Sequence, residues 1–239
     1  MAGSQNVQSP FGVGVLEPSL PRRHDSNYLL VEQVPLGVGG KELVAEADRI
    51  LGGAGLAHGA VFTFDEALGR KLEPDFQALG WNMRRHIWMA QLRQPDRAAD
   101  LSVVKEVREA ELRPGRTRET LAFPWGTEEV AEQLLDAKVL MAERATTRFF
   151  GVPVDGEIVS WADLYLAQGI GQVEDVATRK EHRGKGYATA VVLKAAEEAR
   201  TDGADLVFLV ADEDDWPKEL YGRLGFDTVG RLTKFFLTG

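Results

Sequence analysis

The apolar residues of the second half of the chain form runs that predict alternating strands and helices. Two such runs flank Asp155-Gly156 and predict a β-hairpin with strands at 148–154 and 158–166. After a turn at Gln168-Gly169, the pattern predicts the following elements: a strand at 170–178, a helix at 187–200, a buried strand at 206–210, a helix at 216–224 and one or two strands at 226–237. Asp215 is the expected N-cap of the helix at 216–224, with Pro217 in its first turn.

The first half shows a similar but shorter series. It predicts strands at 28–31, 60–64 and 85–92 and helices at 41–51 and 73–79. Residues 1–23 are rich in Gly, Ser and Pro and lack periodicity, so we expect an arm or loop there. Gln94 to Arg97 has the composition of a linker, which predicts two domains, 1–97 and 98–239.

Between the linker and the hairpin, the pattern is weaker. Residues 101–107 alternate well enough for a strand, and residues 113–126, with two prolines, are expected to be mostly loop. Thr127 is a plausible N-cap for a helix that runs to about Ala145, because Glu128 and Glu129 suit its first turn.

The two series match each other at a fixed offset. Residues 73–81 resemble residues 218–226, and the offset of 145 residues that aligns Gly80 with Gly225 also aligns the flanking strands without a gap. Coincidence between two strand–helix–strand units is the alternative to a duplication. If the duplication is real, Phe76 replaces Tyr221, and Leu36-Gly37-Val38-Gly39-Gly40 replaces a basic turn. The first copy would then have lost its anion-binding and proton-transfer groups.

Composition narrows the class of protein. The chain of 239 residues is 44% hydrophobic and 27% charged, which is typical of a globular protein with a sizeable core. It has no cysteine, so thiolate nucleophiles and disulfides are excluded, and a reducing, cytoplasmic location is expected. No apolar run reaches the roughly 18–20 residues of a membrane span, and the first ten residues do not resemble a signal peptide. The net charge of −9 argues against nucleic acid as a partner, and the four histidines have no metal-ligand spacing.

One basic, glycine-rich turn stands out from this acidic background. Arg183-Gly184-Lys185-Gly186-Tyr187-Ala188 lies between a predicted strand and a predicted helix. Glycines let backbone amides approach a ligand, and a helix N-terminus favours an anion, so the turn can bind a pyrophosphate. Glycines at such a turn can also be purely steric. The pattern is neither a dinucleotide fingerprint nor a P-loop.

The same residues resemble the signatures of the GNAT (N-acetyltransferase) superfamily. Arg183-x-x-Gly186-x-Ala188 is similar to its Arg/Gln-x-x-Gly-x-Gly/Ala signature, and Tyr221 to Phe226 resembles its second signature, Tyr-x-x-x-Gly-Phe. The resemblance covers residues 100–239. It implies a mixed α/β (α+β) fold with a mostly antiparallel sheet flanked by helices. With the repeat, it implies a tandem arrangement whose N-terminal unit is partial and degenerate, without room for the front strands.

The resemblance also implies site residues and a co-substrate, acetyl-CoA. The turn amides would hold the coenzyme A pyrophosphate, and the exposed backbone of a strand splayed from its neighbour would pair with pantetheine. The residues implied are Val176, Ala177 and Thr178 for the strand and His182, Arg183, Gly184, Lys185, Gly186, Tyr187 and Ala188 for the turn. No metal is implied.

Two side chains are candidates for proton transfer. Tyr221 resembles the family's general acid, since a phenol and a thiol have similar pKa values; the alternative is a tyrosine packed on the sheet. The family often places its general base on the strand before the turn, where Glu174 and Asp175 are candidates. Because successive strand residues point to opposite faces, only one should face the acceptor, and Glu174 is preferred. A surface ion pair is the alternative for Glu174.

The function expected from this resemblance is transfer of an acetyl group to an acceptor amine by direct attack. The acceptor is a small-molecule or peptide amine, and the protein is a monomer or homodimer that uses neither nucleic acid nor a membrane. Trp161, Asp163 and Tyr165 share one strand face and either line the acceptor pocket or belong to the core. The alternatives are a non-catalytic acyl-CoA-binding sensor or scaffold, and an acyltransferase that uses a longer acyl-CoA.

Overall fold

A computed structural model describes residues 4–237 of the chain. The helices and strands of these residues are β1 (Gln5–Ser9), β2 (Gly12–Leu16), β3 (Tyr28–Val31), α1 (Gly40–Gly53), β4 (Gly59–Thr63), α2 (Glu66–Ala78), β5 (Asn82–Gln91), β6 (Lys105–Val107), α3 (Glu109–Leu121), α4 (Glu128–Ala142), β7 (Thr146–Val154), β8 (Glu157–Ala167), β9 (Ile170–Thr178), α5 (Tyr187–Thr201), β10 (Leu206–Asp212), α6 (Pro217–Arg223) and β11 (Phe226–Leu237). Short 3-10 helices lie at His24–Ser26, Leu101–Val103 and Lys180–His182.

The chain divides into two compact units that are not contiguous in sequence. The first holds the residues up to Trp88, together with Asp212–Asp215 and the residues from Gly230 on. The second holds Met89–Ala211 and Trp216–Val229. Both units therefore draw residues from both sides of the expected boundary at residues 97–98.

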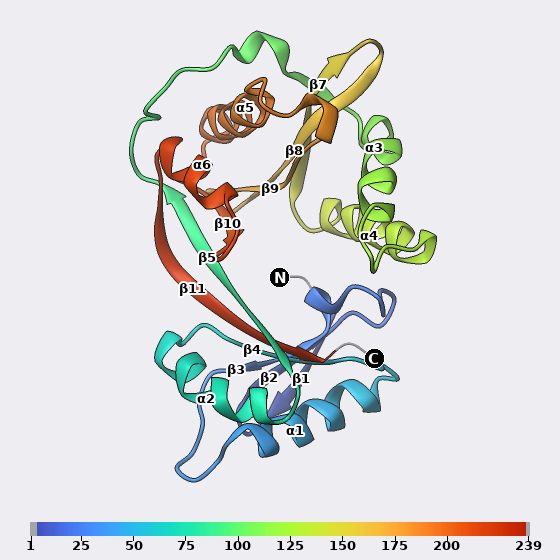
Figure 1. The fold of residues 1–239 in the computed structure, drawn as a ribbon, viewed down its shortest axis with the longest axis vertical. Coiled ribbons are helices and arrows are strands. Elements are labelled where there is room, and N and C mark those ends of the chain that lie inside the picture. The colour runs from blue at the N-terminus through green and yellow to red at the C-terminus, as the bar shows by residue number, and fades with distance from the viewer. Residues whose placement is uncertain (1–3, 238–239) are drawn as a thin grey trace. The chain divides into compact units, whose positions relative to one another are not determined.

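In the second unit, helices cover both faces of the sheet. Strands β6 to β9 pair antiparallel in chain order, and β9 pairs with β10 in parallel. Helix α5 packs on one face of β7, β8 and β9, whereas α3 packs on β8 and α4 on β7 from the other face (Figure 1). Gly171 of β9 has no side chain, and this lets α5 pack closely on the strand, because a Cβ there would lie 2.8 Å from the Cβ of Ala199.

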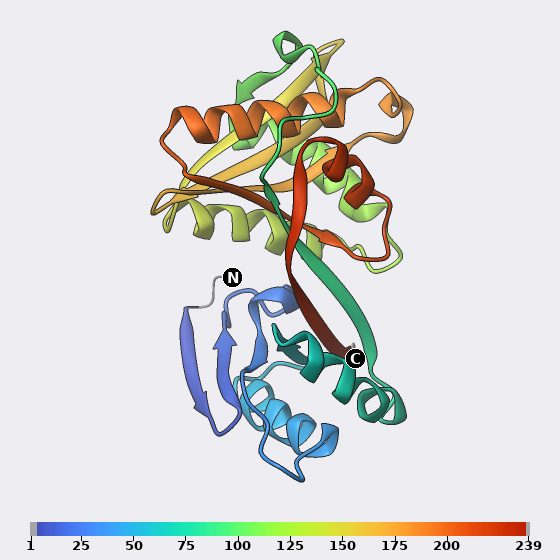
Figure 2. The same ribbon diagram turned by 90° about the vertical axis from the view of Figure 1, so that its left-hand side faces the viewer.

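The first unit repeats this pairing pattern. Strands β1, β2 and β3 pair antiparallel, and β3 pairs with β4 in parallel. Helix α1 packs on β2, β3 and β4 (Figure 2). The succession β1-β2-β3-α1-β4-α2 thus matches β7-β8-β9-α5-β10-α6. The 145-residue offset predicts this match from β3 to α2, whereas β1 and β2 lie before the stretch that it aligns.

The last strand of each repeat does not stay with its own series. In the first unit, β4 pairs antiparallel with β11, so that Gly59 lies opposite Leu237 and Thr63 opposite Thr233. The strand that follows the first series, β5, lies next to β10 of the second series. The predicted mixed, mostly antiparallel sheet with flanking helices is confirmed.

Several local predictions were wrong. Residues 5–16 are two strands rather than an arm, so the first unit does have front strands. Their glycines are required by packing, because a Cβ on Gly14 would lie 2.6 Å from Ile50. The N-cap of α6 is Trp216 rather than Asp215.

The segment expected to be mostly loop contains helix α3, in spite of Pro114. Its first turn carries Glu109 and Glu111, and Glu111 accepts a hydrogen bond from the backbone amide of Arg108 at 2.9 Å. Burial of Leu112 and Arg116, four residues apart, holds one face of the helix against the sheet. Tertiary packing therefore outweighs the backbone hydrogen bond lost at the proline. The strand expected at 101–107 forms only at Lys105–Val107.

Candidate functional site

The turn before α5 leaves backbone amides open to a ligand. Gly184 and Gly186 have φ of +77° and +82°, and a Cβ added to either glycine would meet nothing within 4 Å. Gly186 is the N-cap of α5, so the first amides of the helix have no acceptor within the helix. Arg183 donates from Nε to the carbonyl of Thr178 at 3.0 Å, and Lys185 is exposed. Open amides, a helix N-terminus and two cations together suit an anion.

The strand that leads into this turn separates from its neighbour. Strand β9 pairs with β10 only from Ile170 to Val173 among the described residues, although it continues to Thr178. On its other side β9 stays paired with β8, where Ala177 lies opposite Trp161. The β10-facing edge of the last part of β9 is therefore splayed, which is the geometry expected for pairing with an extended ligand.

A β-bulge lies at the point where β9 leaves β10. Trp161 pairs with Ala177 and Asp163 with Glu174, so two residues of β9, Asp175 and Val176, oppose one residue of β8. Asp175 has a φ of +54°, in the left-handed region that non-glycine residues rarely adopt. The extra residue changes the alternation of side chains along the strand.

A buried group of charges lies on the α3 and α4 face of the sheet at this bulge. Asp163 is fully buried and accepts hydrogen bonds from Arg116 of α3, from Lys138 of α4 at 2.8 Å and from the Tyr165 hydroxyl at 2.9 Å. Asp175 accepts a hydrogen bond from Nε of Arg116 at 2.9 Å, and its Oδ2 is 3.2 Å from Nζ of Lys138. Charges from two helices and two strands are thus neutralised against one another.

Glu174 adjoins the same group. Its carboxylate accepts a hydrogen bond from the side-chain amide of Gln172 at 2.5 Å. Burial raises the pKa of Glu174 above its usual range, although Lys138 opposes the shift. For Lys138, the carboxylates of Asp175 and Asp163 outweigh burial and raise the pKa further above its usual range. The neighbouring carboxylates thus favour the charged form of Lys138, and burial favours the neutral form of Glu174, a shift in the direction that suits a general base.

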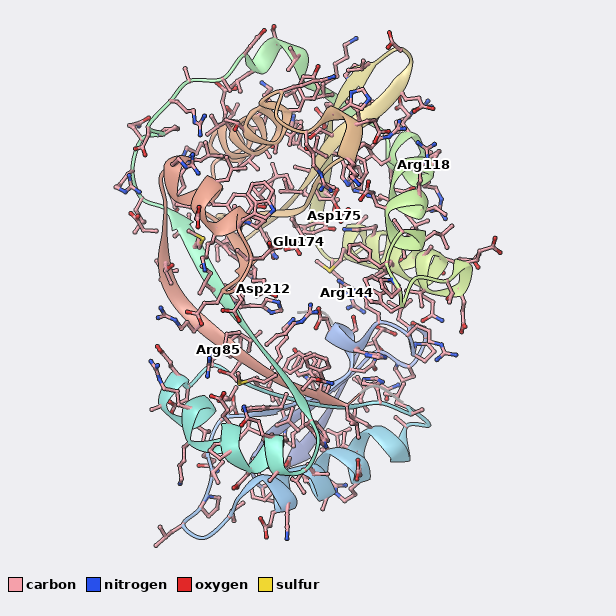
Figure 3. All side chains as sticks on the ribbon, viewed as in Figure 1. Arg85, Arg118, Arg144, Glu174, Asp175 and Asp212 are labelled. Atoms are coloured by element: carbon pink, nitrogen blue, oxygen red, sulfur yellow. The ribbon has the colours of Figure 1, made fainter. Side chains whose placement is uncertain are left out.

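The bulge brings together two carboxylates that the sequence assigned to opposite faces. Glu174 lies directly opposite Asp163 in the ladder, and Asp175 contacts the same two cations as Asp163, so both carboxylates lie on the α3 and α4 side of the sheet (Figure 3). The expectation that they point to opposite faces was wrong, and which of them faces the acceptor stays a prediction. The rule of alternation fails because Asp175 is the extra, left-handed residue of the bulge. Trp161 and Tyr165, the other residues of this face, are buried, as the core alternative predicted.

Tyr221 lies on the helix that follows β10. Because β9 and β10 are parallel, the turn that follows β9 and α6, which follows β10, lie at the same edge of the sheet. The Tyr221 ring is buried and packs edge-on against Phe226, with 6.4 Å between centroids. The last residue of β5 contacts the end of this helix: the side-chain amide of Gln91 donates a hydrogen bond to the carbonyl of Leu224, the C-cap of α6, at 3.0 Å.

The structure adds Arg116 and Lys138 to the residues that sequence analysis singled out. Arg116 was missed because its helix was taken for a loop. Lys138 had a usable signal, since it falls at helical spacing from Ala131 and Leu135, on the apolar side of α4. A lysine in such a row requires buried anionic partners.

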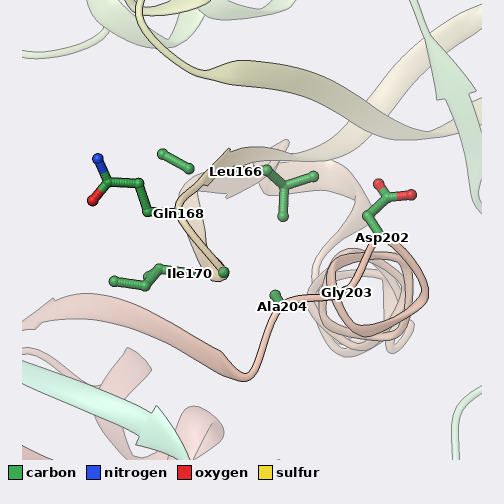
Figure 4. Close-up of a pocket in the computed structure, with 8 residues that line it drawn as sticks. Leu166, Gln168, Ile170, Asp202, Gly203 and Ala204 are labelled. Atoms are coloured by element: carbon green, nitrogen blue, oxygen red, sulfur yellow. The ribbon is translucent and has the colours of Figure 1, made fainter.

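A pocket of about 170 Å³ lies elsewhere in the second unit (Figure 4). It is lined by the turn from Leu166 to Ile170 and by Asp202, Gly203 and Ala204. These residues adjoin the first residue of β9 and the end of α5, whereas the glycine turn adjoins the last residue of β9 and the start of α5. The pocket is therefore separate from the candidate site.

Comparisons with known proteins agree with this geometry. The sequence profile of the Acetyltransferase (GNAT) family matches residues 105–226, about half of the chain. A curated relative, the uncharacterized N-acetyltransferase YobR of Bacillus subtilis (strain 168), is 30% identical over 82 residues. That match covers 34% of this chain and 33% of the relative, so the chain spans about a third of the relative's length.

Solved structures resemble nearly the whole chain. A conserved protein of unknown function from Staphylococcus epidermidis ATCC 12228 has a TM-score of 0.74 at 15% identity, over 98% of this chain and 93% of its own. A GCN5-related N-acetyltransferase from Kribbella flavida has a TM-score of 0.62 at 20% identity, over 99% and 90%. A tandem GNAT protein from the clavulanic acid biosynthesis pathway has a TM-score of 0.60 at 14% identity, over 99% and 84%. At these identities, the likeness shows the fold.

Helices able to span a membrane are not found between residues 4 and 237.

Proposed function

The chain belongs to the Acetyltransferase (GNAT) family, and from this premise we propose that it is an N-acetyltransferase that uses acetyl-CoA and an acceptor amine. The observation that carries the proposal is the splayed end of β9 beside an open glycine turn. We assign catalysis to the second unit and a degenerate, non-catalytic role to the first. The cytoplasmic location expected from the sequence remains part of this proposal.

The turn residues suit the coenzyme A pyrophosphate. The open space at Gly184 and Gly186 leaves room for phosphate oxygens at the amides of Gly184 to Ala188, whereas the amide of His182 already donates to the carbonyl of Arg179 at 2.8 Å. Among the described residues, the buried Nδ1 of His182 has no hydrogen-bond partner within the chain, so a bound ligand could satisfy it. The backbone of Val176, Ala177 and Thr178 would pair with pantetheine along the splayed edge.

Two side chains would move the protons. Acetyl-CoA supplies a thioester whose carbonyl carbon accepts the amine and whose sulfur leaves. Glu174, with its raised pKa, would take the proton that the amine loses, directly or through water. Tyr221 would give its phenolic proton to the departing sulfur, which balances the proton taken up by Glu174.

The proposal is tested by a screen for thiol release from acetyl-CoA with a library of amines. With an amine that supports turnover, Tyr221→Phe should lower kcat roughly 100-fold, because it removes one proton donor. Its Kd for coenzyme A, from calorimetry, should stay within about twofold. Tyr28→Phe, which removes a hydroxyl in the first unit, is the matched control and should leave kcat unchanged.

Other outcomes would support the alternatives. Tight coenzyme A binding without thiol release from any amine would favour the sensor or scaffold. Faster thiol release from propionyl-CoA or succinyl-CoA would favour a longer acyl donor. A Tyr221→Phe variant with wild-type kcat would remove Tyr221 from the mechanism.

The same assay tests Glu174 through its pH dependence. A base loses activity when it is protonated, so kcat/KM for the amine should fall as the pH drops through the raised pKa of Glu174. Lys138 lowers that pKa, so Lys138→Met should move the fall to higher pH. Glu174→Gln should lower kcat and remove this limb of the profile.

A further inference from the structure

We infer that Arg116 and Lys138 are positioning residues for acyl-CoA: they hold Asp175 in its left-handed conformation and so fix the bulge that presents the splayed end of β9. The inference rests on the proposed function, because it assigns a ligand to that edge. It concerns backbone geometry rather than proton transfer.

The backbone at Asp175 is unusual for its place in the fold. Three non-glycine residues have positive φ among residues 4–237: Asp155, Gln168 and Asp175. Asp155 and Gln168 lie in the tight turns that flank β8, where a left-handed residue is ordinary. Asp175 lies inside a strand, where this conformation needs support from its surroundings.

That support comes from two helices on the same side of the sheet. Oδ2 of Asp175 is 2.9 Å from Nε of Arg116 and 3.2 Å from Nζ of Lys138. Both cations are also bound to Asp163 of β8, which is fully buried, so their positions are fixed relative to the neighbouring strand. The Asp175 side chain is therefore held from α3, α4 and β8 at once.

The position of the bulge links this support to the ligand edge. Pairing of β9 with β10 ends at Val173, and the bulge follows two residues later. Val176, the second residue of the bulge, begins the stretch that we expect to pair with pantetheine. If Asp175 returned to an extended conformation, the register of Val176 to Thr178 would shift and their backbone groups would point elsewhere.

The chain offers a matched control for the general effect of losing a paired arginine. Arg148 of β7 contacts three carboxylates at 2.7 Å each, those of Glu106, Glu198 and Asp202. Arg116 likewise lies among three, those of Asp163, Asp175 and Glu109. Loss of either arginine should destabilise the second unit, but only Arg116 contacts the bulge.

The experiment measures coenzyme A binding by calorimetry on the full chain, together with KM for acetyl-CoA and the melting temperature. Asp175→Val, a β-branched residue that disfavours the left-handed region, should weaken coenzyme A binding at least tenfold. Asp175→Gly, which adopts that region freely, should stay within about threefold of wild type although it also loses the ion pairs. Arg116→Lys should weaken binding less than Arg116→Met, whereas Arg148→Met should lower the melting temperature alone.

Two results would overturn the inference. One is equal coenzyme A binding by the Val and Gly variants of Asp175. The other, which decides the matter if Asp175→Val does not fold, is an Arg116→Met variant that melts lower than wild type but has the wild-type Kd and KM. Failure of the wild-type chain itself to bind coenzyme A would instead refute the proposed function.

Discussion

Helix α1 of the first unit and helix α5 of the second both follow a strand of a parallel pair, and both begin at a glycine-rich turn. The backbone amides of the two turns have different hydrogen-bond partners. At the start of α1, Gly40 donates its amide hydrogen to Asp75 at 2.8 Å, and Gly39 donates to Glu42 at 2.9 Å. At the start of α5, Gly184 and Gly186 face open space. The free amides of a helix N-terminus attract an anion in either case, and the first unit supplies that anion from its own side chains.

The two repeats also differ at the position of the proposed general acid, where the first has Phe76 and the second has Tyr221. Phe76 stacks on Phe235 with 4.1 Å between centroids and lies edge-on to Trp81 at 5.2 Å, so it fills the core of the first unit. Tyr221 occupies the same position in the second repeat and carries a hydroxyl. The first repeat thus has internal contacts at the two positions where the second repeat has basic and phenolic groups. The same fold can therefore either leave this helix N-terminus open to a ligand or satisfy it with its own carboxylates.

If the second unit alone binds coenzyme A, a shortened chain tests how far that unit folds and binds by itself. A chain of residues 98–239 lacks Met89–Gln91, which belong to the second unit and extend β5, the neighbour of β10. It also lacks the amide of Leu92, which donates to the carbonyl of Gly225 at 2.9 Å, and Arg93, which pairs with Asp227 at 3.0 Å. We expect it to lose cooperative unfolding and coenzyme A binding, measured by circular dichroism and calorimetry.

A chain of residues 89–239 is the control, because it restores the end of β5. It should recover part of the circular dichroism signal and part of the coenzyme A affinity. Wild-type affinity in the 98–239 chain would show that the contiguous domain predicted from the sequence is self-sufficient, and that coenzyme A binding does not need β5 beside β10.

A smaller effect is expected from charge reversal at the two turns. Arg183→Glu combined with Lys185→Glu should weaken coenzyme A binding by roughly 30-fold, since each reversal costs about 1 kcal/mol at a partly exposed helix N-terminus. Lys41→Glu, in the exposed first turn of α1, should leave Kd unchanged because Asp75 already occupies that N-terminus. Calorimetry should also give one coenzyme A per chain. A second binding event, or a weakened Kd in Lys41→Glu, would show that the first turn is open to ligand.

The sequence was informative wherever a local pattern decided the structure. The strand 170–178 and the N-cap at Thr127 were predicted correctly, since Thr127 accepts a hydrogen bond from the amide of Val130 at 3.2 Å. The repeat predicted the shared order of elements from β3 to α2. The residues of the glycine turn could be named from their spacing, although their roles stay predictions.

What could not be predicted depended on contacts distant in sequence. Strands β1 and β2 have few large apolar residues, and Gly14 makes sense only once Ile50 packs over it. Arg116 lies 47 residues from Asp163 and 59 from Asp175 along the chain, so no local sequence pattern predicts that these charges are buried together. The bulge at Asp175 changes the alternation of side chains through the pairing of two strands, and therefore the placement of Glu174 and Asp175 was wrong.

The smallest effect that we expect is a difference between the two units in how their stability depends on pH. Burial is the main cause of lowered pKa values in three histidines of the first unit: those of His24 and His86 fall to about 4, and that of His58 falls below its usual range. Stability from a lowered pKa is present above the unfolded value of 6.5 and is lost as the pH falls toward 4. Glu174 in the second unit has a raised pKa, so its contribution is lost as the pH rises instead.

Acidification from pH 7 to pH 5 should therefore loosen the first unit and spare the second. We expect a loss of about 1 kcal/mol in the first unit, since the half-buried histidines are partly screened by solvent. Hydrogen exchange resolved by peptide, corrected for the intrinsic pH dependence, should show faster opening of β3 and β4 at pH 5 with β8 and α5 unchanged. His24→Gln removes one titrating group next to His58, 3.9 Å away between ring centroids, and should reduce the difference. Equal loosening of both units would mean that the histidines do not set the acid response, and the comparison between the units would then rest on their turns alone.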